Sequence, residues 1–142
     1  MYTPHTVTLY SLVEDMVTFE VNHYITILRG VFYDSVKAVN VRTSGLENAD
    51  SVSLFIPFSV EAVDGVSLLP KKYVDPKEFE RAADKSGIWT LRPDDFFVKG
   101  EVVDDGDFQG INLRYDDVHN ITKVDKKDFG SPFMQHWEVG GA

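Results

Sequence analysis

The sequence contains no cysteine among its 142 residues. Disulfides, thiolate chemistry and cysteine-based zinc sites are therefore excluded. A membrane-spanning helix needs a run of about eighteen apolar residues, and no run in this sequence comes close to that length. We therefore expect no membrane partner. The amino end has neither the basic nor the apolar region of a signal peptide. We therefore expect the chain to be made in a cytoplasm and to stay there until it assembles.

Positive charge is scarce as well. Lysine and arginine number 14 against 23 acidic residues, which gives a net charge of −9. Such a chain is poorly suited to grip a nucleic-acid backbone, because that requires a basic surface. The charge favours solubility, or a partner with positive patches. A content of 43% hydrophobic and 26% charged residues is typical of a globular protein, and we expect one domain over residues 1–142.

Alternating apolar and polar residues predict strands in the first half of the chain. Residues 6–13 form one such run and residues 17–31 a longer one, with a turn at residues 14–15 that would make them a hairpin. The second run is long enough to be one bent strand, and Gly30 is a suitable bulge or kink point. Residues 52–58 predict a third strand, which Pro57 places at a sheet edge or at its exit.

The second half alternates between short apolar runs and turn residues. The predicted turns lie at residues 63–66 and 92–95, and the predicted strands at residues 88–91, 96–98, 111–115, 119–124 and 135–139. One helix is predicted over residues 76–85, with Asp75 as its cap, Pro76 at its first position, Glu78 completing a capping box and Gly87 as its stop. This pattern predicts a mainly β fold, a small antiparallel β-barrel or sandwich with one short α-helix.

Chemical motifs are sparse. The four histidines have neither the HExxH nor the HxH spacing of a metal site, and no nucleophile elbow or phosphate-binding loop is present. We therefore predict no catalytic residues, no metal and no cofactor. The remaining enzyme alternative is a metal-assisted hydrolase that uses His119, Asp116 and Asp117, which lie close together in the sequence.

The densest acidic cluster comprises Asp104, Asp105 and Asp107. It lacks the loop spacing and the terminal glutamate of an EF-hand. Aspartates beside glycine are typical turn formers, because the carboxylate bonds its own backbone. We interpret the cluster as a solvated loop, with calcium binding and acid–base catalysis by paired carboxylates as the alternatives.

Five segments carry a resemblance to known proteins: residues 2–10 (YTPHTVTLY), 87–95 (GIWTLRPDD), 98–101 (VKGE), 121–127 (ITKVDKK) and 136–141 (HWEVGG). Together they resemble proteins encoded in the structural gene clusters of tailed phages and of prophages of Gram-positive bacteria. The second half is more loosely similar to phage head closure (stopper) and minor capsid proteins. The acidic loop at residues 104–107 departs from the usual pattern of these proteins.

The resemblance implies a virion structural protein at the head–tail junction, a component of the neck that closes the head. It implies a homo-oligomeric ring with portal-adaptor, neck or tail proteins as neighbours, located in the virion after assembly in the host cytoplasm. Loops that line a channel beside packaged DNA, or that form interfaces, would then carry the function. The candidate loop residues are Asp104, Asp105, Asp107, Asp128, Phe129 and Phe133.

Two other functions remain open at this point. A tail-completion or minor capsid protein would come from the same gene clusters and use a similar small β-domain. An acidic protein that mimics DNA would instead block a basic surface of a host protein, and it would need its acidic side chains spread over one exposed face.

Overall fold

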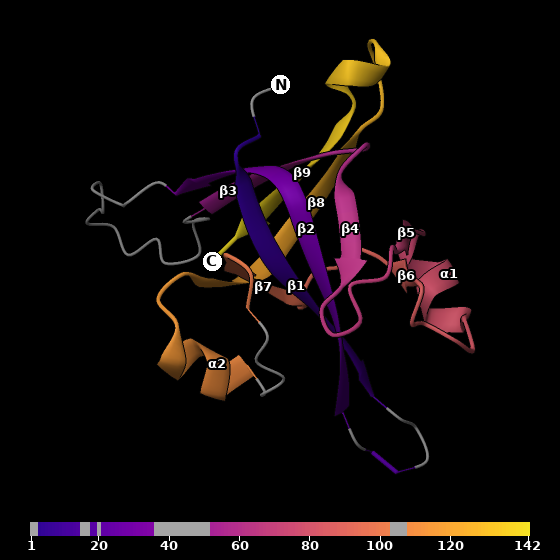
Figure 1. The fold of residues 1–142 in the computed structure, drawn as a ribbon, viewed down its shortest axis with the longest axis vertical. Coiled ribbons are helices and arrows are strands. Elements are labelled where there is room, and N and C mark those ends of the chain that lie inside the picture. Colours follow the sequence, from indigo (N-terminus) through magenta and orange to yellow (C-terminus); the bar gives the residue numbers. More distant parts are fainter. Residues whose placement is uncertain (1–2, 15–17, 20, 36–51, 103–107) are drawn as a thin grey trace.

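A computed structural model describes residues 3–14, 18–19, 21–35, 52–102 and 108–142 of the chain. Its main sheet contains β1 (His5–Glu14), β2 (Val21–Ser35), β3 (Val52–Pro57), β4 (Glu61–Asp64), β7 (Phe96–Lys99), β8 (Val118–Lys127) and β9 (His136–Gly141). The seven strands lie in the order β1-β7-β8-β9-β3-β2-β4. Because β1 also pairs with β2, the sheet closes on itself (Figure 1). The predicted mainly β fold with an antiparallel barrel is confirmed.

The first two strands form the hairpin that the sequence predicts. They pair antiparallel from His5↔Val31 to Glu14↔Val21. The predicted start of the second strand at residue 17 is wrong, because β2 begins at Val21. Phe19, which the alternation placed in that strand, has a φ of 59° and an exposed side chain. A left-handed backbone does not continue a strand, so the alternation over residues 17–21 was misleading.

The second strand serves two partners in succession. Its residues 26–29 pair with β4 and its residues 32–35 pair with β3. Gly30 lies between the two stretches with a φ of 94°, a conformation that favours glycine. The prediction of one long strand that bends at Gly30 is therefore confirmed.

The barrel interior is filled by apolar side chains from every strand of the closed ring. Among them are Leu9, Leu28, Leu54, Phe97, Ile121 and Val139. A second apolar cluster lies on the outer face of β1 and β7, where Tyr10 and Phe96 stack with ring centroids 4.6 Å apart. Ile111 of helix α2 (Phe108–Arg114) belongs to this cluster and is fully buried. Helix α2 thus covers apolar side chains on the outer face of the barrel that would otherwise be exposed to water.

Both helices differ from the predictions. Helix α1 covers Pro76–Arg81 rather than residues 76–85, because Ala82 is already extended, and the Asp75 side chain makes no capping hydrogen bond. Helix α2 replaces the strand predicted at residues 111–115, so that prediction is wrong. The short strands β5 (Lys72–Tyr73) and β6 (Ile88–Trp89) pair in parallel on either side of α1. Of the strand predicted at residues 88–91, only the first two residues are confirmed.

The β8–β9 hairpin projects from the barrel. Most side chains of β8 beyond Ile121 are exposed or half-buried, and the single 3₁₀ turn Pro132–Met134 lies at the end of the hairpin. In Figure 1 this hairpin points to one end of the longest axis, and the β1–β2 hairpin points to the other. Within the described ranges, no helix is both long and apolar enough to cross a membrane.

Candidate functional site

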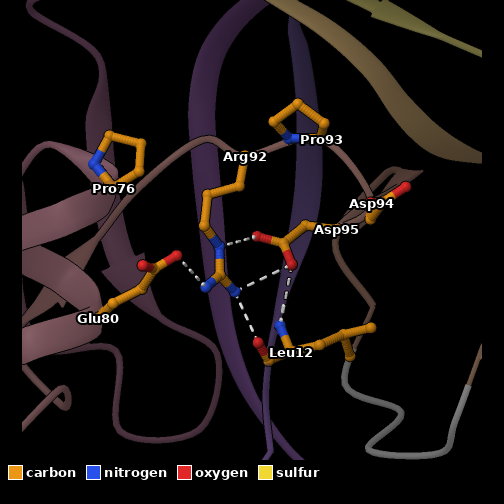
Figure 2. A pocket seen from close by; sticks show the side chains of 7 residues that line it. All are labelled: Leu12, Pro76, Glu80, Arg92, Pro93, Asp94 and Asp95. Carbon is orange, nitrogen blue, oxygen red and sulfur yellow. Dashed lines mark hydrogen bonds and ion pairs between the residues drawn. The ribbon is translucent and has the colours of Figure 1, made fainter.

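A pocket of about 430 Å³ opens between helix α1 and the turn at residues 92–95 (Figure 2). Its lining comes from β1, α1 and the turn, and consists of Leu12, Pro76, Glu80, Arg92, Pro93, Asp94 and Asp95. The two prolines and Leu12 supply apolar walls, and the acidic side chains supply negative charge. We refer to it as the α1 pocket.

The buried Asp95 and the partly buried Arg92 shape this pocket. The Arg92 Nε and Nη2 atoms donate to the two carboxylate oxygens of Asp95 at 3.0 and 3.1 Å. Arg92 Nη2 also donates to the Leu12 carbonyl at 2.6 Å, and the Leu12 N–H donates to Asp95 Oδ1 at 3.1 Å. Two-pronged bonding of this kind fixes both side chains in one geometry.

The position of Leu12 explains why the pair is there. Strands β1 and β7 pair only from Val7↔Lys99 to Tyr10↔Phe96. Leu12 lies beyond the last of these pairs, so its peptide groups have no strand partner on this side. Asp95 and Arg92 provide one acceptor and one donor in place of the missing strand. The turn at residues 92–95 therefore completes the barrel edge with side chains, which satisfies buried peptide groups.

The surroundings of the pair are mostly apolar. The Arg92 guanidinium lies 5.2 Å from the ring centre of the fully buried Phe79, and its Nη1 atom lies 3.5 Å from the half-exposed Glu80 carboxylate. Burial raises the pKa of Asp95, although the hydrogen bonds from Arg92 and Leu12 act in the opposite direction. Asp94 is exposed at the rim with a φ of 78°, which aspartate tolerates better than most residues.

A second cation, which is buried, fastens the turn that follows β4. Lys71 Nζ donates to the Ile25 carbonyl and to Thr26 Oγ1, both at 3.1 Å, and lies 3.4 Å from Asp64 Oδ1. Asp64 in turn accepts hydrogen bonds from the N–H groups of Val66 and Ser67, both at 2.9 Å. A turn is present where the sequence predicted one at residues 63–66, but it covers residues 65–67, because Val63 and Asp64 still belong to β4.

This turn presents apolar side chains to the solvent. The exposed ones are Val66, Leu68 and Leu69. Burial lowers the pKa of Lys71, although Asp64 opposes this. Partial burial acts to raise the pKa of Asp64, but hydrogen bonds from Ser67 and Val66 and the charge of Lys71 outweigh it and leave that pKa lowered.

The candidate loop residues fall in two places. Asp104, Asp105 and Asp107 lie outside the described residues. Asp128 and Phe129 lie at the end of the β8–β9 hairpin, and both are exposed. The backbone of Phe133 lies in the 3₁₀ turn, but its side chain is outside the described part. We refer to residues 128–134 as the hairpin tip.

The metal-assisted hydrolase alternative is wrong about its metal site. No group of three or more histidine, aspartate or glutamate side chains among the described residues could hold a metal ion, and His119, Asp116 and Asp117 are all among them. His119 Nε2 of β8 instead lies 2.8 Å from the hydroxyl of Tyr33 of β2, a strand that is not a neighbour of β8 in the sheet. Close sequence spacing did not bring the three side chains to one point.

Sequence reasoning missed the α1 pocket. It predicted the turn at residues 92–95, but it gave Arg92 and Asp95 no role beyond turn formation. The only signal in the sequence was the arginine three residues before an aspartate, which is common and unspecific. The pocket needs Leu12, some eighty residues away in the chain, and no local pattern indicates that contact.

Comparison with known proteins gives one match. No curated protein and no solved structure matches the chain significantly. A family described as a family of unknown function, DUF6751, matches residues 2–142. Since this match covers nearly the whole sequence, the chain belongs to the DUF6751 family of unknown function.

Proposed function

We propose that this chain is a structural protein of the phage head–tail junction, which assembles as a ring with other copies of itself and contacts neighbouring neck or tail proteins. The proposal rests on the segment resemblance, on the shape of the molecule and on the placement of its exposed apolar side chains. A closed barrel is a rigid body, because every strand of the ring has a partner on each side.

Three of the seven exposed large apolar side chains in the described residues lie at the ends of the two projecting hairpins. Phe129 and Met134 are 72% and 64% exposed at the hairpin tip, and Phe19 is 72% exposed at the end of the β1–β2 hairpin. The other four lie on the turn after β4 and on α2. A lone soluble domain has little reason to place large apolar groups at its farthest points. Such groups are typical of surfaces that become buried against a partner.

The acidic side chains favour this function over a DNA mimic. Several carboxylates are occupied in holding turns of their own chain: Asp64 bonds the turn after β4, Asp84 accepts from the N–H of Ser86 at 3.0 Å, and Asp95 bonds Leu12. A mimic would present its carboxylates to the partner. The same small barrel also suits a tail-completion or minor capsid protein, which the experiment below separates by the particle that binds.

The test is negative-stain microscopy of the purified protein, alone and mixed with heads or tails of the phage whose structural gene cluster encodes it. We expect rings of the protein alone at high concentration, or decoration of the neck of the particles. A matched pair of variants sharpens the result. Phe129→Ser with Met134→Ser should abolish ring formation, whereas Leu113→Ser should not, although Leu113 is 87% exposed on α2. A strict monomer that binds neither particle contradicts the proposal.

A further inference from the structure

The hairpin tip is built to hold its shape. The Gln135 side-chain amide donates to the carbonyls of Asp128 and Gly130 at 3.3 and 3.5 Å, and the Met134 N–H donates to the Ser131 carbonyl at 2.9 Å. Gly130 has a φ of 86°, which permits the sharp turn. A projection that is already ordered loses less conformational entropy when it binds than a loose loop would. The backbone on either side of Phe129 is therefore held in place, and the Phe129 side chain is exposed on it.

The α1 pocket has the complementary properties. Pro76, Pro93 and Leu12 form apolar walls along an open space of about 430 Å³, which is large enough to admit an aromatic side chain. The bonds between Arg92, Asp95 and the Leu12 backbone hold one wall against another, so the pocket is also ordered before binding. An aromatic group in a well-formed apolar pocket is a common centre of binding energy.

The charges of the two sites also match. Residues 121–142 balance three lysines with three acidic residues, so residues 1–120 carry the whole net charge of −9. Lys126 and Lys127 stand at the end of β8, directly before the hairpin tip, and the exposed Asp128 follows them, so residues 126–134 carry a net charge of +1. Lys127 also lies 3.9 Å from the Glu138 carboxylate of its own hairpin. Glu80 and Asp94 are exposed at the mouth of the α1 pocket. A tip that enters the pocket brings positive charge to an acidic rim, which favours this orientation over a tip against a tip.

The tip cannot enter the pocket of its own chain. The β8–β9 hairpin extends to one end of the longest axis, whereas α1 lies at the side of the barrel, well away from that end (Figure 1). The two complementary sites therefore need two copies. Contact between two unlike faces repeats from copy to copy, and it closes into a ring when the rotation between copies allows.

We infer that the hairpin tip of one copy docks into the α1 pocket of a second copy, with Phe129 between Pro76 and Pro93 and with Lys126 and Lys127 facing Glu80 and Asp94. This inference rests on the proposed ring assembly and names the two faces that form it. The same contact made by every copy uses one tip and one pocket per chain.

The absence of cysteine allows a direct test by cross-linking. Phe129→Cys and Glu80→Cys variants, one of them carrying a size tag, are mixed and oxidised. We expect the mixed disulfide between F129C and E80C to exceed either homodimer at least severalfold. The double variant F129C/E80C should give a ladder of higher multimers on a non-reducing gel, because each chain then offers both sites.

A matched control uses Leu113→Cys, which places an equally accessible thiol on α2. Its mixture with E80C should give only the low level of random collision. The inference is overturned if L113C joins E80C as well as F129C does, if F129C prefers itself, or if no mixed disulfide forms. In a second measurement, Lys126→Glu with Lys127→Glu should shift self-association to at least tenfold higher concentration, and an unchanged association would overturn the charge match.

The outcomes separate this inference from the proposed function. Rings in the microscope without the F129C–E80C disulfide would overturn the docking and leave the proposed function standing. The disulfide together with a protein that binds neither heads nor tails would establish the docking and contradict the proposed function.

Discussion

Two turns of this protein are fastened to the barrel by a cation, partly buried in one turn and buried in the other, and they differ in what the cation does. At residues 92–95 an arginine and an aspartate bond each other through two prongs and also bond both peptide groups of Leu12. At residues 64–71 a lysine reaches across to the β2 backbone, and its distance to Asp64 is the longer 3.4 Å. Arg92 and Asp95 form a tight ion pair that takes the place of a strand partner for Leu12. Lys71 acts mainly as a hydrogen-bond donor to β2, and its ion pair with Asp64 is looser.

The difference follows from the chemistry of the two side chains. Guanidinium is planar, stays charged and matches a carboxylate with two parallel bonds, whereas ammonium is a compact charge whose pKa falls readily on burial. The side chain of Lys71 is only 1% exposed, so most of its hydration is lost. We therefore expect the free energy of unfolding to fall strongly when Asp95 of the 92–95 turn is removed. We expect it to fall only weakly when Lys71 of the 64–71 turn is removed.

The largest expected effect is that of Asp95→Ala. It removes the partner of a partly buried guanidinium and leaves the Leu12 N–H without an acceptor, so it should lower the free energy of unfolding by about 3 kcal/mol. Urea unfolding followed by tryptophan fluorescence measures this loss. Asp94→Asn is the matched control on the same turn, since the Asp94 side chain is exposed and asparagine tolerates its φ of 78°. Equal losses for the two variants would show that the pair adds nothing specific.

A smaller effect is expected for Lys71→Met. The variant replaces a desolvated ammonium with an apolar chain of similar length. The Asp64 carboxylate that it leaves behind is partly exposed and still accepts from the N–H groups of Val66 and Ser67. The Ile25 carbonyl keeps the Gly65 N–H as a donor, and Thr26 Oγ1 loses the bond from Lys71, so the net loss should be about 1 kcal/mol. The same urea titration measures it. A loss as large as that of D95A would contradict the distinction between the two turns.

The smallest effect should appear in the pH dependence, where the two acids act in opposite directions. The pKa of Asp64 is lowered by folding from 3.8, so its contribution to stability is present above that value and is lost as the pH falls through the folded pKa. The pKa of Asp95 is raised by folding from 3.8, so its contribution favours the fold at low pH and is lost as the pH rises through the folded pKa.

Amide variants of the two acids separate these contributions. On acidification from about pH 7 to about pH 3, D64N should lose less stability than the unmodified protein, because it lacks a carboxylate that must be protonated. D95N should lose more, because it lacks the group that favours folding at low pH. Unfolding curves at several pH values measure both slopes. If both variants lose less stability than the unmodified protein, or both lose more, one of the assigned pKa directions is wrong.

Strands could be predicted from the sequence where they bury one face only, because their apolar and polar residues then alternate. Strand β3 alternates between buried and half-buried side chains, and the length and bend of β2 followed from its pattern and from Gly30. Helix α2 could not be read in this way, because Ile111, Leu113 and Tyr115 alternate as in a strand. In the helix, Ile111 is buried and Leu113 is exposed, and the Tyr115 N–H bonds the Ile111 carbonyl. The spacing of four residues was the better signal.

The α1 pocket lay beyond local patterns for a different reason. Its walls come from β1, α1 and the turn before β7, and they meet only because β1 and β7 are neighbours in the ring. Ring order depends on contacts between distant segments. The turn residues were identified correctly, but their partner Leu12 was out of reach for an argument that proceeds along the chain.

The closed ring also determines how the molecule would carry a pulling force between its two hairpins. Such a force has two routes from the β8–β9 hairpin to the β1–β2 hairpin, one through β7 and the other through β9 and β3. Both routes load lateral hydrogen bonds between antiparallel strands. Strands β7 and β8 share three residue pairs, from Phe96↔Asn120 to Val98↔Val118, and three further backbone hydrogen bonds that flank these pairs, whereas β3 joins β9 through six pairs. If the strands of one route separate under tension, the other route still holds the two ends together.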